Sequence, residues 1–329
     1  MKGLTGWARC PGTCGEWVQG AKNGIPFLID CPVNRFVETG VEIHLTDDFF
    51  KQDVLKQNLK SSYWNLPQEK GKTLIALDRL AKEYQLPSFR GQIYWESQLP
   101  EGKGMASSTA DMIAAMAAVK HAFQIPVNAE VLAKIALEVE PTDPVMYEGI
   151  TEFAHRDGSY AKSLGPVMPS YLLMLDWGGS LDTQKFNAQD QLAVHYRKNE
   201  KIIRGALAHF YEGMETRDLE KIAYASTISA RCNQEINPKP NFESFLTWVK
   251  KNEGLGVVTA HSGTLLAGVF PIDSSLKSLR NIEAEARSHF GAAAIDWVKT
   301  CNGGVQGGMS NARWESIRSN GEVWQGFVY

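Results

Sequence analysis

A glycine-rich segment, Pro100 to Asp111, separates an expected strand from a strongly apolar helix and reads PEGKGMASSTAD. Its glycines let the backbone turn sharply and approach a ligand closely. The free N–H groups at the start of the following helix favour an anion. The hydroxyls of Ser107, Ser108 and Thr109 can bond phosphate oxygens or bind Mg²⁺, which prefers few protein oxygens together with waters and phosphates. The segment therefore predicts a phosphate-binding loop.

Two better-known phosphate loops do not match this segment. No Gly-Lys-Ser/Thr run closes it, so it is not a Walker A loop. The spacing of its glycines, and its position far from the N-terminus, do not fit the dinucleotide fingerprint. A glycine- and serine-rich helix cap that binds nothing is the remaining alternative, and the segment by itself leaves it open.

Hydrophobic spacing predicts secondary structure on both sides of the loop. In the first half we expect a half-buried strand over 37–45, a helix over about 74–84, a short strand at 93–95, a helix over 109–123, and a helix that begins after the N-cap Asn128. In the second half we expect a strand over 171–175, helices over 192–210, 219–228 and 242–249, strands over 257–259 and 265–269 around a turn, a helix over 275–289 and a strand over 293–298. Residues 302–308 read as a loop without chemistry.

This order of elements indicates an α+β fold of two domains, residues 1–165 and 166–329. The chain has 329 residues, and 43% of them are hydrophobic, which is enough for two packed cores. Its formal charge of −3 argues against nucleic acid or an anionic membrane as a partner. The longest apolar stretch, 112–119, is shorter than the ~20 residues of a membrane span. Five unevenly spaced cysteines and no apolar leader lead us to expect a cytoplasmic protein.

Three motifs in one order resemble those of the GHMP kinases. The glycine-rich loop looks like the central motif of that family, which prefers Leu and Gly where this chain has Met105 and Ala106. Near the N-terminus RCPGTCGEWVQG, residues 9–20, resembles the first motif, which lines the substrate pocket. TAHSGTLLA, residues 259–267, resembles the third motif, a strand–turn–strand element that closes over the phosphate loop.

The resemblance implies an N-terminal domain like ribosomal protein S5 domain 2 and a ferredoxin-like C-terminal domain. It also implies ATP as phosphoryl donor and Mg²⁺ as cofactor. The nucleotide phosphates would lie against the central loop, on Pro100, Gly102, Lys103, Gly104, Met105, Ala106, Ser107, Ser108 and Thr109. Ser262 and Gly263, at the turn of the third motif, would lie beside the substrate.

The turn Glu140-Pro141-Thr142-Asp143-Pro144 supplies the acid–base and metal candidates. Two prolines hold Asp143 in one orientation, and in many relatives an aspartate at the matching place faces the substrate hydroxyl. Asp143 is therefore the predicted base, with a structural turn residue as the alternative. In several relatives a glutamate binds Mg²⁺ beside the serine of the loop, so the resemblance implies that Glu140, with Glu138 as the alternative, is the second ligand of Mg²⁺ beside Ser108.

One departure from the family pattern concerns positive charge. Many relatives carry Lys or Arg directly after the Pro-Gly of the first motif, where this chain has Thr13. Lys103, inside the loop, is the predicted catalytic substitute, with Arg9 as the alternative. Glu16 could bind the ammonium of an amino-acid substrate and Arg35 its carboxylate through a bidentate pair.

The strings PGTCGEWVQG, GKGMASSTAD, EPTD and AHSGT together look most like the L-threonine kinase branch of the family. That branch makes O-phospho-L-threonine for the aminopropanol side chain of cobalamin, so the resemblance implies L-threonine as the small-molecule partner. Another GHMP kinase, such as one for homoserine, and a nucleotide-binding protein without turnover are the alternatives. The sequence does not fix the oligomeric state and leaves a homodimer open.

Overall fold

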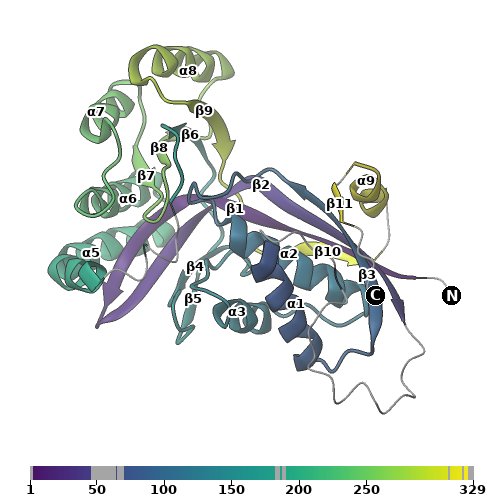
Figure 1. Cartoon of the computed structure of the whole chain (residues 1–329). Coiled ribbons are helices and arrows are strands. Elements are labelled where there is room, and N and C mark those ends of the chain that lie inside the picture. The colour runs from purple at the N-terminus through teal and green to yellow at the C-terminus, as the bar shows by residue number, and fades with distance from the viewer. Residues whose placement is uncertain are drawn as a thin grey trace.

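The computed structural model describes residues 3–45, 64, 70–181, 186, 190–309, 312–320 and 322–324. They form a mixed α+β fold in which helices cover both faces of a long, bent sheet (Figure 1). Among these residues no helix has both the length and the apolar character needed to cross a membrane. The α+β fold class predicted from the sequence is confirmed.

The elements of the first half alternate strands and helices. In chain order they are β1 (Leu4–Lys22), β2 (Ile25–Leu45), α1 (Gly71–Glu83), β3 (Phe89–Ser97), α2 (Ser107–Ala122), α3 (Ala129–Leu137), β4 (Ile150–Phe153) and β5 (Ala161–Gly165). The second half contains β6 (Ser170–Asp176), α5 (Asp190–Thr216), α6 (Leu219–Asn233), α7 (Phe242–Lys251), β7 (Gly256–Thr259), β8 (Leu266–Pro271), α8 (Leu276–Phe290), β9 (Ala294–Lys299), β10 (Gln306–Met309), α9 (Ala312–Asn320) and β11 (Glu322–Trp324).

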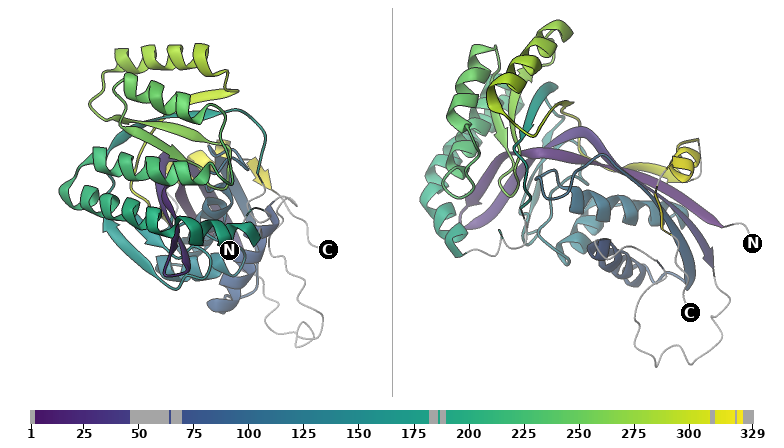
Figure 2. Two further views of the ribbon diagram at one scale, coloured as in Figure 1. Left: turned by 90° about the vertical axis from the view of Figure 1, so that its left-hand side faces the viewer. Right: turned by 45° about the horizontal axis from the view of Figure 1, so that its top comes forward.

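One sheet runs through the whole molecule in the strand order β11-β3-β2-β1-β7-β8-β6-β9. β10 pairs with β1, and the β4–β5 hairpin extends from β2. The long β1–β2 hairpin is the connection, because its start lies with β3 beside α1 and α2 while its tip reaches α5 (Figure 2). The β1–β2 hairpin therefore runs through both halves of the chain.

Helix α2 is the centre of the first half because small side chains let it lie directly on β1. A Cβ at Gly6 would stand 2.2 Å from the carbonyl oxygen of Ala118, so the strand backbone touches the helix backbone. All but three of the residues of α2 are buried, including its run of alanines. This tight contact, near the C-terminal end of α2, holds the helix directly against the sheet.

Most elements expected from hydrophobic spacing are present, including the helix cap at Asn128, whose side chain accepts a hydrogen bond from the backbone N–H of Val131 at 3.1 Å. One expectation was wrong, because residues 306–308, expected to be loop, belong to β10. The polar face of the strand over 37–45 is covered only at one end. There α9 packs on β2 and β3, so Glu38 is buried and paired with Arg313, whereas Glu42 is half-buried and His44 is exposed.

The C-terminal elements β10 and β11 pair with β1 and β3, strands of the first half. The chain therefore returns to its N-terminal half after completing the second. The boundary between residues 165 and 166 stays a prediction.

The glycine loop is held by backbone hydrogen bonds on two sides. The N–H groups of Thr13 and Gly15, in β1, donate to the carbonyls of Met105 and Gly104 at 3.0 and 3.3 Å. The N–H groups of Thr264 and Leu265, after the β7–β8 turn, donate to the carbonyl of Lys103 at 3.0 and 3.3 Å. The loop is thus clamped between the first and third motifs, as the family resemblance implied.

We expect Gly104→Ala to disrupt this clamp. Gly104 has a φ of 85°, and a Cβ there would stand 2.3 Å from the Cβ of Ala260. Gly24 is a matched control because its φ is 77° and nothing lies within 4 Å of an added Cβ. The Gly24→Ala change should cost only the left-handed backbone, ~1 kcal/mol. Gly104→Ala should cost ~1–3 kcal/mol more from the clash. Denaturant unfolding of both variants checks the difference, and equal losses would contradict the clamp.

Candidate active site

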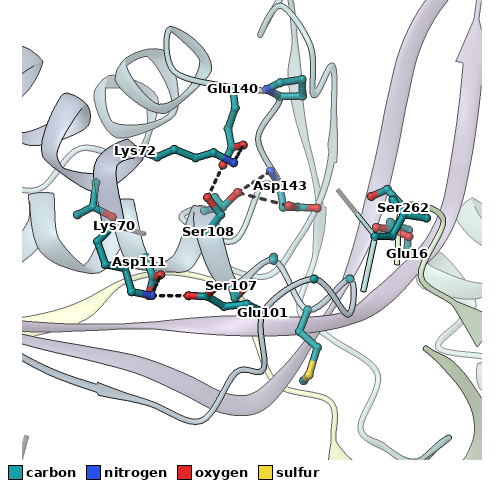
Figure 3. Close-up of a pocket in the computed structure, with 18 residues that line it drawn as sticks. Glu16, Lys70, Lys72, Glu101, Ser107, Ser108, Asp111, Glu140, Asp143 and Ser262 are labelled. Atoms are coloured by element: carbon teal, nitrogen blue, oxygen red, sulfur yellow. Dashed lines mark hydrogen bonds and ion pairs between the residues drawn. The ribbon is translucent and has the colours of Figure 1, made fainter. Parts of the chain in front are cut away.

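The glycine loop opens onto a cavity of about 340 Å³ between the first, second and third motifs (Figure 3). The lining comes from the loop and the start of α2, the start of α1, the turn after α3, the β7–β8 turn, and single residues of β1 and the segment after β6. It consists of Glu16, Lys70, Lys72, Thr73, Glu101, Gly102, Gly104, Met105, Ala106, Ser107, Ser108, Thr109, Asp111, Glu140, Pro141, Asp143, Leu181 and Ser262.

The N-terminus of α2 faces this cavity without a side-chain cap. Ala106 precedes the helix with a φ of 55°, in the left-handed region where the family pattern prefers glycine. No side chain accepts the N–H groups of the first turn at this cap. A helix start of this kind leaves donors and a positive dipole end for an anion. The residues around it therefore suit a phosphate group.

A hydroxyl, a carboxylate and an ammonium group meet beside the helix start. The hydroxyl of Ser108 donates to Glu140 Oε1 at 2.5 Å, and Lys72 Nζ donates to Glu140 Oε2, also at 2.5 Å. Glu140 follows α3, and its backbone N–H donates to the carbonyl of Ala136. The turn after α3 thus brings its carboxylate onto the first turn of α2.

A second ion pair joins the starts of α1 and α2. Lys70 Nζ lies 2.6 Å from Asp111 Oδ2 and 2.8 Å from Glu101 Oε1. Burial raises the pKa of Asp111 to about 6, and the Glu101 carboxylate adds to this, whereas the Lys70 ammonium lowers it. Lys70 therefore carries most of the charge compensation at this side of the cavity.

Asp143 lies between the Glu140 side of the cavity and Glu16 (Figure 3). Burial raises its pKa to about 7, and the carboxylates of Glu16 and Glu140 raise it further, whereas the Thr109 hydroxyl lowers it. Thr109 Oγ1 lies 3.4 Å from Asp143 Oδ2. A carboxyl group with such a pKa can accept or release a proton near neutrality.

The opposite end of the cavity is formed by Glu16 and Ser262 (Figure 3). The turn that carries Ser262 is held from behind by the chain after α6. Asn237 Nδ2 donates to the carbonyls of His261 and Gly263, both at 2.9 Å, and Lys239 Nζ donates to the carbonyl of Gly263 at 2.9 Å. These three hydrogen bonds from side chains to backbone carbonyls therefore help to position the turn.

Most of the site residues predicted from the sequence line this single cavity. These are Glu16, Gly102, Gly104, Met105, Ala106, Ser107, Ser108, Thr109, Glu140, Asp143 and Ser262. Pro100, Lys103, Gly263 and Arg35 do not line it. Gly263 packs on the loop from outside, because a Cβ there would stand 2.2 Å from the carbonyl oxygen of Lys103.

The placements of Lys103 and Arg35 correct the sequence analysis. Lys103 Nζ donates to the carbonyl of Gly179 at 2.6 Å and lies 2.7 Å from Asp176, so its charge is used outside the cavity. Arg35 pairs with Asp296 on β9. Each of these two cations is paired with a carboxylate that does not line the cavity.

The sequence analysis missed Lys70 and Lys72, which supply the cavity with positive charge. A signal was present, since both lysines lie just before the helix predicted over about 74–84. Cations are disfavoured at a helix N-terminus by the helix dipole unless an anion pairs with them. Glu101, Thr73 and Asp111 were missed as lining residues for another reason: only the packing of α1 on α2 brings them to the same space.

Comparison with known proteins gives these features a family. Residues 71–147, which contain the glycine loop and the three lysine-paired carboxylates Glu101, Asp111 and Glu140, match the model of the GHMP kinases N terminal domain. The chain is 28% identical over 264 residues to an L-threonine kinase of Citrobacter freundii, an alignment that covers 79% of this chain and 84% of that protein.

Solved structures agree with this fold over nearly the whole chain. The L. major mevalonate kinase in complex with R-mevalonate superposes with a TM-score of 0.62 at 13% identity, covering 92% of this chain and 97% of that one. The homoserine kinase of Cytophaga hutchinsonii gives 0.61 at 16% identity, covering 93% and 98%. With the three motifs around one cavity and the matching N-terminal domain, the chain belongs to the GHMP kinase superfamily.

Proposed function

We propose that this protein is an L-threonine kinase that transfers the γ-phosphoryl group of ATP to the hydroxyl of L-threonine, for the side chain of cobalamin. The observation that carries the proposal is the meeting, in one cavity, of an uncapped helix start, a Ser108–Glu140 oxygen pair and Asp143. The similarity to L-threonine kinases over most of both chains supports the choice of acceptor.

The residues present suit Mg²⁺. Ser108 and Glu140 offer a hydroxyl and a carboxylate oxygen already in contact, and Mg²⁺ prefers few protein oxygens of this kind. Among the described residues no group of three or more His, Cys, Asp or Glu side chains could hold a metal by itself. Ser108 and Glu140 would therefore hold the ion together with phosphate oxygens, and the ion would neutralise charge on the transferring phosphoryl group.

The protein's own contribution is positioning and proton transfer. The N–H groups at the start of α2 would hold the phosphates. Lys72, which contacts Glu140, would lie beside the same phosphate groups. The threonine hydroxyl would give its proton to Asp143 as its oxygen forms the new bond to phosphorus. The bond from phosphorus to the β-phosphate oxygen breaks in the same step and ADP leaves with that oxygen.

The amino-acid part of the acceptor would lie toward Glu16. A carboxylate at that end would bind the threonine ammonium, while Ser262 offers a hydroxyl beside it. Arg35 has no part in this proposal. A cytoplasmic location and a homodimeric assembly stay predictions.

The proposal is tested by a substrate screen that monitors ADP release. We expect L-threonine to be preferred over L-serine by ~10- to 200-fold in kcat/KM, since one packed methyl group is worth ~1–3 kcal/mol. L-Homoserine should be poor, because its hydroxyl stands one carbon further from the ammonium. A higher kcat/KM for homoserine than for threonine would refute the acceptor and leave the kinase family untouched. ATP binding with no acceptor phosphorylated would favour a protein without turnover.

Lys72→Met should impair ATP use more than Lys103→Met. Lys72 contacts Glu140 in the cavity, whereas Lys103 pairs with Asp176 outside it. Loss of a cation at the phosphates should cut kcat by ~10²-fold or more, about 2.7 kcal/mol. The Lys103 variant should instead show lower thermal stability with kcat within a few-fold. Steady-state kinetics and melting curves of both variants check this, and the reverse order would return the role to Lys103.

Asp143→Asn should lower the activity and also remove a dependence of kcat/KM on pH. If the ionised carboxylate is the base, kcat/KM should rise with pH through about 7 in the wild-type enzyme. In kcat this rise should be centred at a lower pH than in kcat/KM, because cations bound near Glu16 and Glu140 offset the carboxylate repulsion that helps to raise the pKa of Asp143. The Asn variant should lose ~10²–10⁴-fold in kcat and show no rise of this kind with pH.

A stability measurement separates this role from that of a turn residue. A raised carboxyl pKa means that the folded protein binds the proton more tightly, so stability is lost as pH rises from about 4 to 7. The Asn variant should lack the part of this loss that comes from Asp143, while Asp111 and Asp30, whose pKa values are also raised by burial, keep theirs. Wild-type turnover in a stable Asn variant would remove Asp143 from the mechanism.

A further inference from the structure

A chain of buried hydrogen bonds runs from Glu16, at the end of the cavity, into the second half of the molecule. Glu16 Oε2 accepts from the backbone N–H of His261 at 2.8 Å and from His261 Nδ1 at 2.9 Å. His261 Nε2 lies 3.0 Å from the hydroxyl oxygen of Ser229, on α6. The chain thus joins the first motif, the third motif and a helix that neither motif contains.

The directions of these bonds follow from their chemistry. A carboxylate only accepts hydrogen bonds, so Nδ1 of His261 carries a hydrogen and donates it in the hydrogen bond to Glu16. In the neutral ring, Nε2 is then an acceptor, and the Ser229 hydroxyl donates to it. The backbone N–H of Gln19 in turn donates to the Ser229 oxygen at 3.0 Å. Each buried member therefore has a partner, and Glu16 is held in one rotamer.

Both bonds to Glu16 from the described residues end on Oε2, which leaves Oε1 for the cavity. The surroundings of this carboxylate are acidic. Asp30 is its cross-strand partner in β2, is 1% exposed, and has an Oδ2 without a hydrogen-bond partner in the described structure. Burial lowers the pKa of Lys239 to about 7, although the Glu16 carboxylate raises it, and this lysine donates to the backbone carbonyls of Asn237 and Gly263. This end of the cavity consequently favours a small cation.

We propose that His261 and Ser229 are positioning residues that hold Glu16 to receive the ammonium group of the acceptor, which makes the enzyme specific for amino alcohols. The inference rests on the proposed function and adds to it the source of its selectivity. A carboxylate held by two donors on one oxygen loses little freedom on binding, so its contribution to recognition is large. Asp143 is linked to this chain through the charge of Glu16, which adds to the effect of burial in raising the pKa of Asp143.

The experiment compares L-threonine with 3-hydroxybutanoate, which keeps the hydroxyl and carboxylate and lacks the ammonium. Wild-type enzyme should prefer threonine by ~10²-fold or more in kcat/KM, since the analogue leaves the buried carboxylate unpaired. Glu16→Gln should lose this preference, chiefly because its kcat/KM for threonine falls. His261→Leu should raise the KM for threonine by ~10-fold and leave the KM for ATP within a few-fold. His261→Asn, which keeps a side-chain donor near Nδ1, should recover most of that loss.

Two comparisons separate positioning from general stability. In the Glu16→Gln background His261→Leu should add no further loss for threonine, because the two residues act as one unit. Ser226→Ala is the matched control for Ser229→Ala, since both serines are fully buried on α6 and Ser226 donates to the carbonyl of Val257 instead. Only the Ser229 variant should raise the KM for threonine, by ~3-fold.

Several results would overturn the inference. These are equal losses for threonine and 3-hydroxybutanoate in His261→Leu, additive losses with Glu16→Gln, or the same KM change in both serine variants. If the best acceptor proves to be an alcohol without an ammonium, the inference fails and the kinase stands. If no acceptor is phosphorylated, the proposed function fails, and calorimetric binding of threonine and 3-hydroxybutanoate to wild type and the Ser229 and Ser226 variants still decides the inference.

Discussion

The site depends on the backbone hydrogen bonds that clamp the glycine loop between two strands. Carbonyls of Lys103, Gly104 and Met105 point outward to β1 and to the β7–β8 turn. With its carbonyls used in this way, the loop presents the N–H groups at the start of α2 to the cavity. The contact with β1 is close enough that glycine is needed at several positions. The same main-chain hydrogen bonds therefore hold the two halves of the chain together at the loop and create the anion-binding surface.

Charge around the cavity is balanced in pairs. Lys70 compensates Asp111 and Glu101, and Lys72 compensates Glu140. Glu16 and Asp143 have no lysine partner among the described residues that line the cavity, and burial, together with repulsion from Glu16 and Glu140, raises the pKa of Asp143. The paired side suits phosphates and a divalent ion, and the unpaired side suits a proton and an ammonium group. The two substrates of a kinase need this division.

The gathering of negative charge at the Glu16 end of the cavity reduces the stability of the folded protein. Asp30 is buried beside Glu16, and burial, together with Asp143 and Glu16, raises its pKa. Buried carboxyl groups without a counter-charge reduce stability unless they are protonated. The clamped turn at 261–263, with its contacts to Asn237 and Lys239, keeps this region ordered. Strain of this kind is typical of a site prepared for a ligand.

Short-range pattern was sufficient for most of the helices and several strands, for the glycine loop and for the turn that holds Glu140 and Asp143, but not for β10. Those it predicted depend on residues close together in the chain, through hydrophobic period, backbone freedom or capping. The direction of the Lys103 side chain, the partner of Arg35, the cover of Glu38 and the chain from Glu16 to Ser229 depend on residues 32 to more than 200 positions apart. Those contacts arise only when α1 packs on α2 and the β1–β2 hairpin reaches the second half. Because a charged side chain takes whichever partner packing brings nearest, tertiary structure alone decided which lysines serve the cavity.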